Sequence, residues 1–452
     1  MSAVTAELIA RYNRPGPRYT SYPPVPRWKT GGSTADWHEL LARVDGPVAL
    51  YVHIPFCVSQ CTYCGCNMVV SKRQSAGDRY LDALEAQLAT LRRPQVRWLH
   101  LGGGTPTWLD PQQLHRLFAM LDAHAPRLPD HETSVEIDPE VADDARLEAL
   151  FAGGTNRVSI GVQSLDPTVL EAVGRPQSLS TLRRVVEGSR ARGARSVNLD
   201  LMVGLPHQSL ASLDGTLDGV LSLAPERLAV FGYAHVPWMK RNQRSIDEAA
   251  LPAPALRAAL TARAHQRLVS AGYLALGMDH FALPTDALAE AWSSRRMGRN
   301  FMGYTPHREL PVLGVGMSAI SEVHGHFLQQ EAHLGRWWTA VEAGEVPVHR
   351  TYASTCDDLV RADVIRQILC DGEVNLARVE ERWGVPAHSL FSQAEPQLQP
   401  LRADGLVTVR GHRITVTELG QRFLRLVAMA FDPAMAPRSV TGDSTPRYSQ
   451  TV

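Results

Sequence analysis

Short apolar runs alternate with amphipathic stretches over most of this 452-residue chain, and that alternation limits the folds open to it. Six of the runs have the length and β-branched content of buried strands. Such a pattern predicts successive βα units, in which helices join parallel strands. The predicted strands are Val48–Ile54, Val96–Leu101, Ser134–Ile137, Arg157–Val162, Ser196–Val203 and Arg227–Tyr233, and the predicted helices between and after them are Asp78–Leu91, Pro111–His124, Leu179–Ala191, Ser209–Leu223 and Pro254–Ala271.

Six such strands are typical of a partial barrel, so the predicted fold class is α/β, a parallel partial (βα)6-type barrel with its C-terminal extension over residues 47–345. Closely spaced prolines predict an extended N-terminal arm over residues 1–46. Residues 346–452 are predicted to form a mostly helical, winged-helix-like domain, because helical stretches precede two alternating runs about a glycine turn. Its helices are expected at Leu359–Leu369, Leu376–Trp383 and around Leu390–Leu401, with a loosely held tail from Asp432.

Charge and hydropathy exclude several classes of partner. The 46 basic and 46 acidic side chains balance, and no basic stripe marks the C-terminal helices, so nucleic acid is not a predicted partner. The chain has no run of about 18 uncharged apolar residues and no signal-peptide pattern at its start, which predicts a cytoplasmic protein without a membrane span.

Four of the six cysteines lie within ten residues, directly after the first predicted strand. Three thiolates spaced Cys57-x-x-x-Cys61-x-x-Cys64 can bind three irons of a cubane iron–sulfur cluster and leave the fourth iron open to a small molecule. Structural zinc and redox-active thiols are the alternatives, although zinc sites generally need a second ligand pair and none follows. In the iron–sulfur interpretation Cys66 is a spare loop residue.

Glycine and polar residues follow the other predicted strands. The run Gly102–Pro106 follows the second strand and Glu136 ends the third, while Gln163, Asp200 and Ala234 stand at the ends of later strands. The carboxyl ends of parallel strands meet at one edge of a barrel, which is where such folds carry their chemistry. We therefore expect these residues to surround the cysteine loop.

The arm and three later segments carry further candidates. Arg18, Tyr19 and Tyr22 offer a guanidinium and two rings that suit a planar anionic ligand. Glycines and aromatic residues in the later segments are interpreted as loops that approach a ligand closely. These segments are Gly277–Phe281, Arg299–Thr305 and Leu313–Ile320.

The cysteine spacing, the aromatic Tyr63 and the run Gly102–Thr105 resemble the radical S-adenosylmethionine (radical SAM) enzymes. More narrowly, four segments resemble the oxygen-independent coproporphyrinogen III oxidase family, with the ending Arg447–Val452 as weaker support. These segments are Pro17–Pro23, Tyr51–Cys66, Gly277–Phe281 and Asn300–Thr305.

This resemblance implies an oxidoreductase with a [4Fe–4S] cluster whose open iron binds S-adenosylmethionine, beside a second S-adenosylmethionine. It implies anaerobic radical oxidative decarboxylation of two propionate side chains of coproporphyrinogen III to vinyl groups, which gives protoporphyrinogen IX in haem and porphyrin biosynthesis. A separate electron donor, a final electron acceptor and a monomeric protein are also implied.

The resemblance assigns site residues one at a time. Cys57, Cys61 and Cys64 match the cluster ligands, whereas Cys66 does not. The matches to the cluster-bound S-adenosylmethionine are Tyr51, Gly103, Glu136 and Ile320, and the matches to the second molecule are Tyr63, Gly104, Thr105, Gln163, Arg175, Asp200 and Ala234. On the substrate side, Arg18 and Arg299 are candidates for binding propionates and His53 for proton or electron movement.

Three alternatives stay open at this point. One is a related radical SAM enzyme that acts on haem or another substrate, and a second is a haem-binding chaperone. Such chaperones generally lack the N-terminal arm and a cysteine placed like Cys66, so both features favour the oxidase. The third is a scaffold organised by zinc, which an anaerobic absorption spectrum would distinguish from an iron–sulfur protein.

Overall fold

The computed structural model describes residues 5–435 and 448–451, and the six predicted strands are all present. They lie side by side in chain order, each parallel to the next, so the predicted barrel-type fold is confirmed. The sheet stays open because antiparallel strands extend both of its edges. The six strands are β2 (Val48–Ile54), β5 (Val96–Gly103), β6 (Arg127–Ile137), β7 (Arg157–Gln163), β8 (Ser196–Val203) and β9 (Arg227–Gly232).

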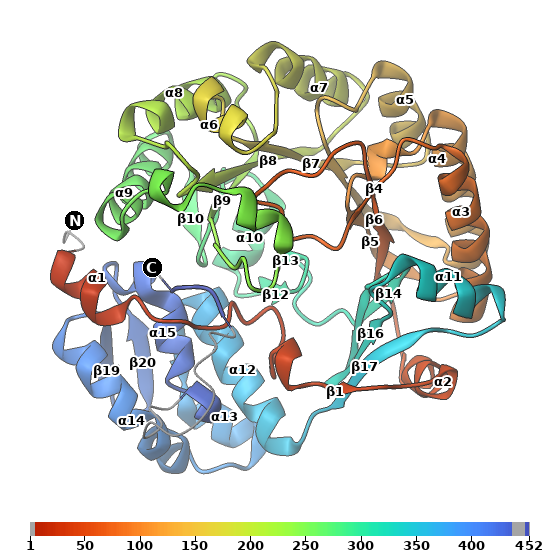
Figure 1. Ribbon diagram of the computed structural model, residues 1–452. Helices are drawn as coiled ribbons and strands as arrows, with labels where there is room; N and C mark the ends of the chain where they lie inside the picture. Colours follow the sequence, from red (N-terminus) through yellow and green to blue (C-terminus); the bar gives the residue numbers. More distant parts are fainter. Residues whose placement is uncertain (1–4, 436–447, 452) are drawn as a thin grey trace.

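Helices cover the outer face of this curved sheet (Figure 1). Helix α4 (Pro111–His124) shows why they form: Asp110 caps its start in a capping box, proline occupies the first turn, and one face buries Leu114, Leu117 and Leu121. The bounds of α4 and α7 agree with the prediction, whereas the short α5 and α6 were not predicted. The helices are α3 (Ser75–Leu88), α4, α5 (Asp144–Ala152), α6 (Pro167–Ala172), α7 (Leu179–Ala191), α8 (Leu210–Leu221) and α9 (Pro254–Ser270).

The strands that extend the sheet edges were not predicted. Strand β14 (Val312–Val315) pairs in parallel with β2 and continues into the antiparallel β15 (Ile320–Val323), so part of the expected ligand loop is sheet. A Cβ on Gly314 would lie 2.3 Å from the carbonyl oxygen of Ile320, so glycine is needed there for strand packing. The remaining edge strands are β16 (His326–Gln330), β17 (Val348–Ala353) and β1 (Lys29–Thr30) beyond β15, and β11 (His280–Ala282) and β10 (Leu274–Leu276) beyond β9.

The C-terminal region is helical with a small sheet, as predicted. Its three-stranded sheet has the order β18-β20-β19, and the β19–β20 hairpin is the predicted pair of alternating runs. The region has its own apolar core, separate from that of the barrel. Its elements are α12 (Cys356–Asp371), β18 (Glu373–Asn375), α13 (Leu376–Trp383), α14 (Ala387–Ala403), β19 (Val407–Arg410), β20 (Arg413–Val416) and α15 (Leu424–Met429).

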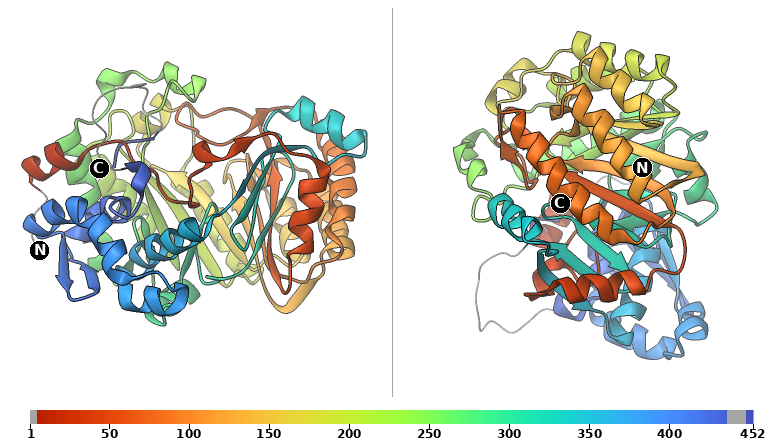
Figure 2. Two further views of the ribbon diagram at one scale, coloured as in Figure 1. Left: turned by 90° about the horizontal axis from the view of Figure 1, so that it is seen from below. Right: turned by 90° about the vertical axis from the view of Figure 1, so that its right-hand side faces the viewer.

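The N-terminal arm joins the barrel to the C-terminal region, as Figures 1 and 2 show. Tyr19 and Tyr22, expected to face a ligand, are instead buried in the C-terminal core, and their hydroxyls donate hydrogen bonds to Asp432 over 3.1 and 3.4 Å. Further along, α2 (Thr34–Ala42) packs on the barrel through the fully buried Trp37. Two aromatic rings of the arm therefore stabilise the contact between the two regions.

The end of the chain returns to this arm. Gln450 forms a β-bridge with Pro15, and the amide of Gly16 donates to the carbonyl of Ser449 over 3.0 Å. Much of the predicted loose tail, 436–447, lies outside the described residues, as do Arg447 and Val452 of the ending motif.

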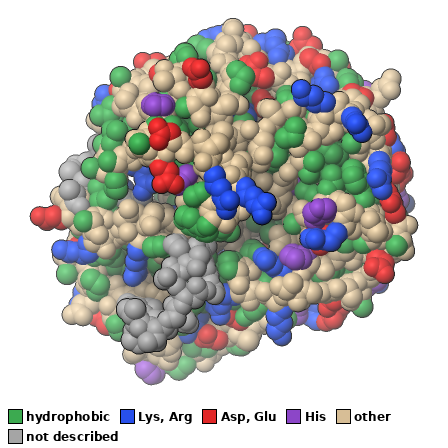
Figure 3. Space-filling view, viewed as in Figure 1, with side chains coloured by type: hydrophobic (Ala, Val, Ile, Leu, Met, Phe, Trp, Pro, Cys, Tyr) green, Lys and Arg blue, Asp and Glu red, His purple; other side chains and the backbone are tan. Residues whose placement is uncertain are grey.

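Figure 3 shows acidic and basic side chains scattered over this face of the molecule, with a group of apolar side chains on its right-hand side. Among the described residues, no helix is both long enough and apolar enough to cross a membrane.

Candidate active site

The cysteine loop follows β2 at the edge where the parallel strands end. Its sulfur atoms each contact a polar group: Cys57 Sγ lies 3.3 Å from Thr105 Oγ1, Cys61 Sγ accepts from Arg175 over 3.6 Å, and Cys64 Sγ accepts from the Cys66 amide over 3.4 Å. All of these cysteines are free thiols. The loop thus presents three unpaired thiols beside residues that follow β5 and β7.

Two amide side chains that the sequence analysis missed hold the loop in shape. Asn242 donates to the carbonyl oxygens of Cys61, Thr62 and Cys64 over 3.2, 3.0 and 3.0 Å. Gln243 donates to the carbonyls of Tyr63 and Ala234 over 2.9 and 3.2 Å. Both lie in the short helix η4 (Arg241–Ser245), and nothing in their sequence spacing connects them with the cysteines.

The thiols fit the donor set of an iron–sulfur cluster. Hydrogen bonding from Cys66 is the main cause that lowers the pKa of Cys64 to about 6, and Lys240 and Arg175 add positive charge. Burial raises the pKa of Cys57 to about 12, so its deprotonation needs a positive partner such as iron. Within the described residues, no three His, Cys, Asp or Glu side chains lie close enough together to hold a single metal ion.

The glycine run at the end of β5 brings the backbone against Glu136. The Gly103 amide donates to Glu136 Oε2 over 3.1 Å, and His100 lies 3.3 Å from Oε1. A Cβ on Gly102 would lie 3.0 Å from that carboxylate, while Gly103 has a φ of +120°. Burial opposes the charge of Glu136, but the hydrogen bonds from His100 and Gly103 leave its pKa below the ordinary value. A carboxylate is thus held ready to bind a cationic group.

Tyr51 and His53 form a buried pair on β2. The Nε2 atom of His53 lies 2.8 Å from the carbonyl of Asn67, so it donates there, and Nδ1 accepts from the Tyr51 hydroxyl over 2.9 Å. Burial lowers the pKa of His53 to about 4, so the ring is neutral at pH 7. Phe301 packs edge-on against Tyr51 with 5.0 Å between ring centroids, and Ile320 begins β15 in the adjoining sheet extension.

The end of β7 and the loop after α6 carry polar atoms suited to a ligand. Gln163 has a φ of +65°, and its buried Oε1 atom has no hydrogen-bond partner among the described residues. Arg175 donates to the Gly161 carbonyl over 2.8 Å and lies 3.3 Å from Asp138, while its Nε is also buried and unbonded within the described chain. Such atoms are ordinarily satisfied, so a polar ligand is the natural partner.

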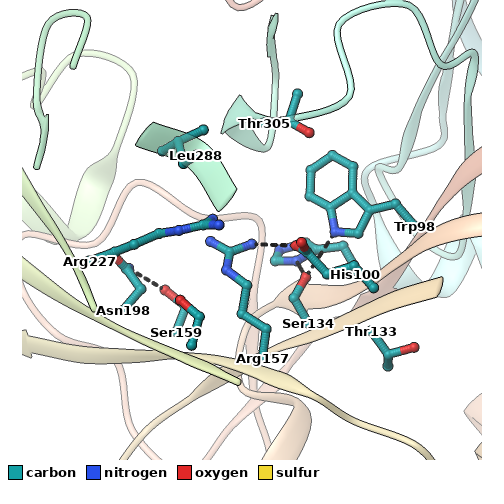
Figure 4. Close-up of polar contacts among 12 residues, drawn as sticks. Trp98, His100, Thr133, Ser134, Arg157, Ser159, Asn198, Arg227, Leu288 and Thr305 are labelled. Carbon is teal, nitrogen blue, oxygen red and sulfur yellow. Dashed lines mark hydrogen bonds and ion pairs between the residues drawn. The ribbon is translucent and has the colours of Figure 1, made fainter. Parts of the chain in front are cut away.

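A polar ladder lines the barrel interior below this edge (Figure 4). Ser134 Oγ lies 3.2 Å from Trp98 Nε1 and 2.6 Å from His100 Nδ1, and the amide of Asn198 donates to Ser159 over 2.8 Å. None of these residues was predicted to belong to the site. Polar side chains at alternate positions of β7 and β8 were the available signal, because alternate residues of a strand face one side of the sheet.

Asp200 is the ladder residue nearest the edge on β8, and it accepts from Ser159 and Asn198 over 3.0 and 2.7 Å. Burial raises its pKa from 3.8 to about 6, so the native state binds a proton more tightly than the unfolded chain between pH 4 and 6. The charged carboxylate of Asp200 therefore lowers the free energy of unfolding above pH 6. Below pH 4 the group is protonated in both the folded and the unfolded state, so this loss of stability is absent.

Replacing Asp200 with Asn should raise the free energy of unfolding at pH 7 by about 3 kcal/mol, since its pKa rises from 3.8 to about 6 and one pKa unit corresponds to about 1.4 kcal/mol. The same change should weaken S-adenosylmethionine binding. Urea unfolding at pH 4.5 and 7 measures the first effect, and equilibrium dialysis measures the second. As a matched control, Asp214→Asn should destabilise, because Arg263 and Arg267 lower the pKa of that carboxyl. Equal pH dependence of Asp200→Asn and the wild type would contradict the assignment.

Arg18 and Arg299, far apart in sequence, lie together on the β9 side of the site. Arg18 donates to the Gly232 carbonyl over 2.7 Å, and Arg299 donates to the Arg18 carbonyl over 3.4 Å. The guanidinium of Arg299 also stacks over Tyr304, 4.5 Å from the ring centroid. Neither arginine forms an ion pair within the described residues, so both are available to an anionic ligand.

Two models of known protein families match this chain. Residues 51–219 match the family model of the Radical SAM superfamily, and residues 355–423 match that of the HemN C-terminal domain. The barrel, the three-cysteine loop and these matches define the protein as a radical SAM enzyme.

Relatives that match this chain over nearly its full length identify its family among the radical SAM enzymes. The oxygen-independent coproporphyrinogen III oxidase of Pseudomonas aeruginosa is 39% identical over 437 residues, which cover 94% of this chain and 95% of the relative. That of Escherichia coli is 38% identical over 431 residues, 94% of either chain. A solved structure of coproporphyrinogen III oxidase (HemN) from Escherichia coli, a radical SAM enzyme, has a TM-score of 0.88 and covers 92% of this chain and 97% of its own. This chain belongs to the oxygen-independent coproporphyrinogen III oxidase family and is an oxidoreductase.

Proposed function

We propose that this protein converts two propionate side chains of coproporphyrinogen III into vinyl groups and so produces protoporphyrinogen IX without oxygen. The observation that carries the proposal is the loop of three free thiols at the carboxyl edge of the barrel, in a chain that resembles coproporphyrinogen III oxidases over almost its whole length. Each propionate loses one hydrogen atom, one electron and carbon dioxide. The electron passes to a one-electron acceptor that is separate from this chain.

Cys57, Cys61 and Cys64 would hold a [4Fe–4S] cluster, and its open iron would bind S-adenosylmethionine. When bound, this pair supplies the carbon-centred radical that removes the hydrogen atom. Tyr51, Gly103, Glu136 and Ile320 would contact that S-adenosylmethionine. Glu136, held by Gly103 and His100, is placed to bind its ammonium group, and the buried Tyr51 ring excludes water.

A second S-adenosylmethionine would occupy the β7–β9 side of the edge. The unbonded atoms of Gln163 and Arg175 support this assignment, because a carboxylate can bind the guanidinium of Arg175 and a polar group can donate to Gln163. Asp200 can accept from ribose hydroxyls. The other contacts would come from Tyr63, Gly104, Thr105 and Ala234, which lie in or beside the cysteine loop or at the end of β9.

The positively charged side chains on the substrate side fit a ligand with four propionates. Arg18 and Arg299 would bind propionates, because each holds its guanidinium near the end of β9 without an ion-pair partner in the described chain. His53, neutral and bonded to Tyr51, would position that tyrosine, and it could pass a proton along this pair. The protein would act as a monomer in the cytoplasm, with a separate electron donor. The reducing conditions there would keep its free thiols available.

The deciding experiment is anaerobic incubation of the iron- and sulfide-reconstituted protein with coproporphyrinogen III, S-adenosylmethionine and a reductant. We expect protoporphyrinogen IX and two molecules of carbon dioxide for each substrate molecule. Methionine and 5′-deoxyadenosine without decarboxylation would instead identify a radical SAM enzyme with another substrate. Haem binding without turnover would favour the chaperone, and absence of a broad visible absorption band would favour zinc.

A further inference from the structure

A cavity of about 150 Å³ lies between the barrel and the C-terminal region, next to the arm. It is bounded by the end of β9, by α9, by the start of α15 and by Ser449–Thr451, and Figure 1 shows α9 and α15 facing each other across the arm. Arg18, Arg257, Arg422 and Arg425 line it, and Asp279 is the acidic residue in its wall. The cavity therefore carries more positive than negative charge.

Three of these arginines, Arg18, Arg422 and Arg425, have no carboxylate hydrogen-bonded to them within the described part of the chain. Arg18 donates to the Gly232 carbonyl, and Arg425 donates to the carbonyls of the arm and the chain end, including that of Gln450 over 3.0 Å. Arg422 interacts with Glu418 only through its charge. Asp279 is already engaged by His280 over 2.8 Å. The guanidinium groups can therefore accept a further anion without giving up an ion pair.

Burial and mutual repulsion disfavour the charged form of these arginines. Burial, with repulsion from Arg18 and Arg299, lowers the pKa of Arg425 to about 9. Burial likewise lowers the pKa of Arg18 and of Arg422. An anion in the cavity would offset this cost, because a carboxylate accepts two parallel hydrogen bonds from a guanidinium and neutralises it.

The size and walls of the cavity limit which anion fits. Its volume, about 150 Å³, is below the roughly 300 to 1,000 Å³ typical of pockets that enclose whole ligands, so it suits one side chain of a larger molecule. Val230, Met278 and Phe423 supply apolar wall beside the guanidinium groups, as an alkyl carboxylate requires. The lining includes none of the cysteine loop, the glycine run or Glu136, so an anion bound here stands apart from the reacting centre.

We infer that this cavity binds one propionate of the tetrapyrrole, a propionate that is not being oxidised while it is held there. The inference rests on the proposed function and deepens it, since it assigns the C-terminal region a direct part in binding substrate. Arg422 and Arg425 then act with Arg18 to anchor the substrate while another propionate reacts.

Arg422→Gln is the cleanest test, because the Arg422 side chain makes no hydrogen bond within the described residues, so its replacement should leave the fold intact. A hydrogen bond to a charged group contributes about 1.5 to 3 kcal/mol, so KM for coproporphyrinogen III should rise about 10-fold or more. We expect kcat and the cluster spectrum to stay unchanged, because this contact is the same in the ground and transition states. Arg263→Gln, on the same helix as part of the cavity wall but paired with Asp214 outside it, is the matched control and should leave KM unchanged.

A binding measurement separates charge recognition from a structural effect. Fluorescence quenching should show that Arg422→Gln binds coproporphyrin III about 10-fold more weakly than the wild type but binds its tetramethyl ester equally well. Equal weakening for acid and ester, or an unchanged affinity for the acid, would overturn the inference. If the wild type binds the acid but does not decarboxylate coproporphyrinogen III, the proposed function fails. The comparison of acid with ester still decides whether the cavity binds a propionate.

Discussion

Replacing Cys61 with alanine is expected to eliminate both the visible iron–sulfur absorption and the cleavage of S-adenosylmethionine. The thiol lies 3.6 Å from Arg175 in a loop shaped by Asn242, so no other cysteine can take its place without rebuilding the loop. Activity should fall to background, because removal of one of three thiolates leaves a second iron without its protein ligand. Anaerobic spectra and 5′-deoxyadenosine measured by chromatography provide the two readouts.

Cys66→Ser provides the matched control within the same loop. Its backbone amide still donates to Cys64, and the serine hydroxyl can replace the thiol as a donor, so the absorption band should persist. Cys356→Ser, an exposed cysteine of the C-terminal region, should change neither readout. If Cys61→Ala retained the band and Cys66→Ser lost it, the ligand assignment within the loop would be wrong.

Arg227→Met is expected to destabilise the barrel by about 3 to 5 kcal/mol, the usual cost of breaking a buried ion pair from one side. Arg227 and Asp286 are 1% and 2% exposed, and their side chains lie 2.5 Å apart in the barrel interior. Without the guanidinium, the Asp286 carboxylate keeps, among the described residues, only the hydrogen bonds from Ser196 and the Leu288 amide, over 2.9 and 2.8 Å. The shift of the urea unfolding midpoint, followed by tryptophan fluorescence, measures the loss.

A pair whose arginine is 66% exposed gives the comparison for this prediction. Arg336→Met, which breaks the pair with Glu331, should cost no more than about 1 kcal/mol, because solvent already screens the guanidinium. The double variant Arg227→Met and Asp286→Leu should recover part of the stability, since it leaves no uncompensated charge. A loss in Arg227→Met as small as that in Arg336→Met would show that the interior pair contributes little.

Local pattern was enough to predict the barrel. The strands β2 and β8 and the helices α4, α7 and α13 have the predicted bounds. β2 is a short apolar run buried at every position, and the side chains of Asp110 and Ser178 cap the starts of α4 and α7. The edge hairpins escaped prediction, since their strands of three to six residues contain glycines and polar side chains. The period of such short segments is too weak to distinguish strand from loop.

The candidate site also has residues that the sequence predicted and residues that it did not. Spacing alone indicated the cysteine loop, and the carboxyl-edge rule brought Glu136, Gln163 and Asp200 to it. Asn242 and Gln243 could not be predicted, because their hydrogen bonds join segments about 180 residues apart. Tyr19 and Tyr22 show the converse error: their rings suit a ligand, but the C-terminal core buries them.

The sequence by itself determined the order of strands and helices and the chemistry of the thiols, because period, capping and ligand spacing are properties of neighbouring residues. Only the tertiary structure decided where the charges lie. It placed Arg18 of the arm beside Arg422 and Arg425 of the C-terminal region, and it enclosed Arg227 with Asp286. Burial and long-range contacts set the pKa values of these groups and the energies of their interactions. Neither burial nor long-range contact can be obtained from the spacing of residues along the chain.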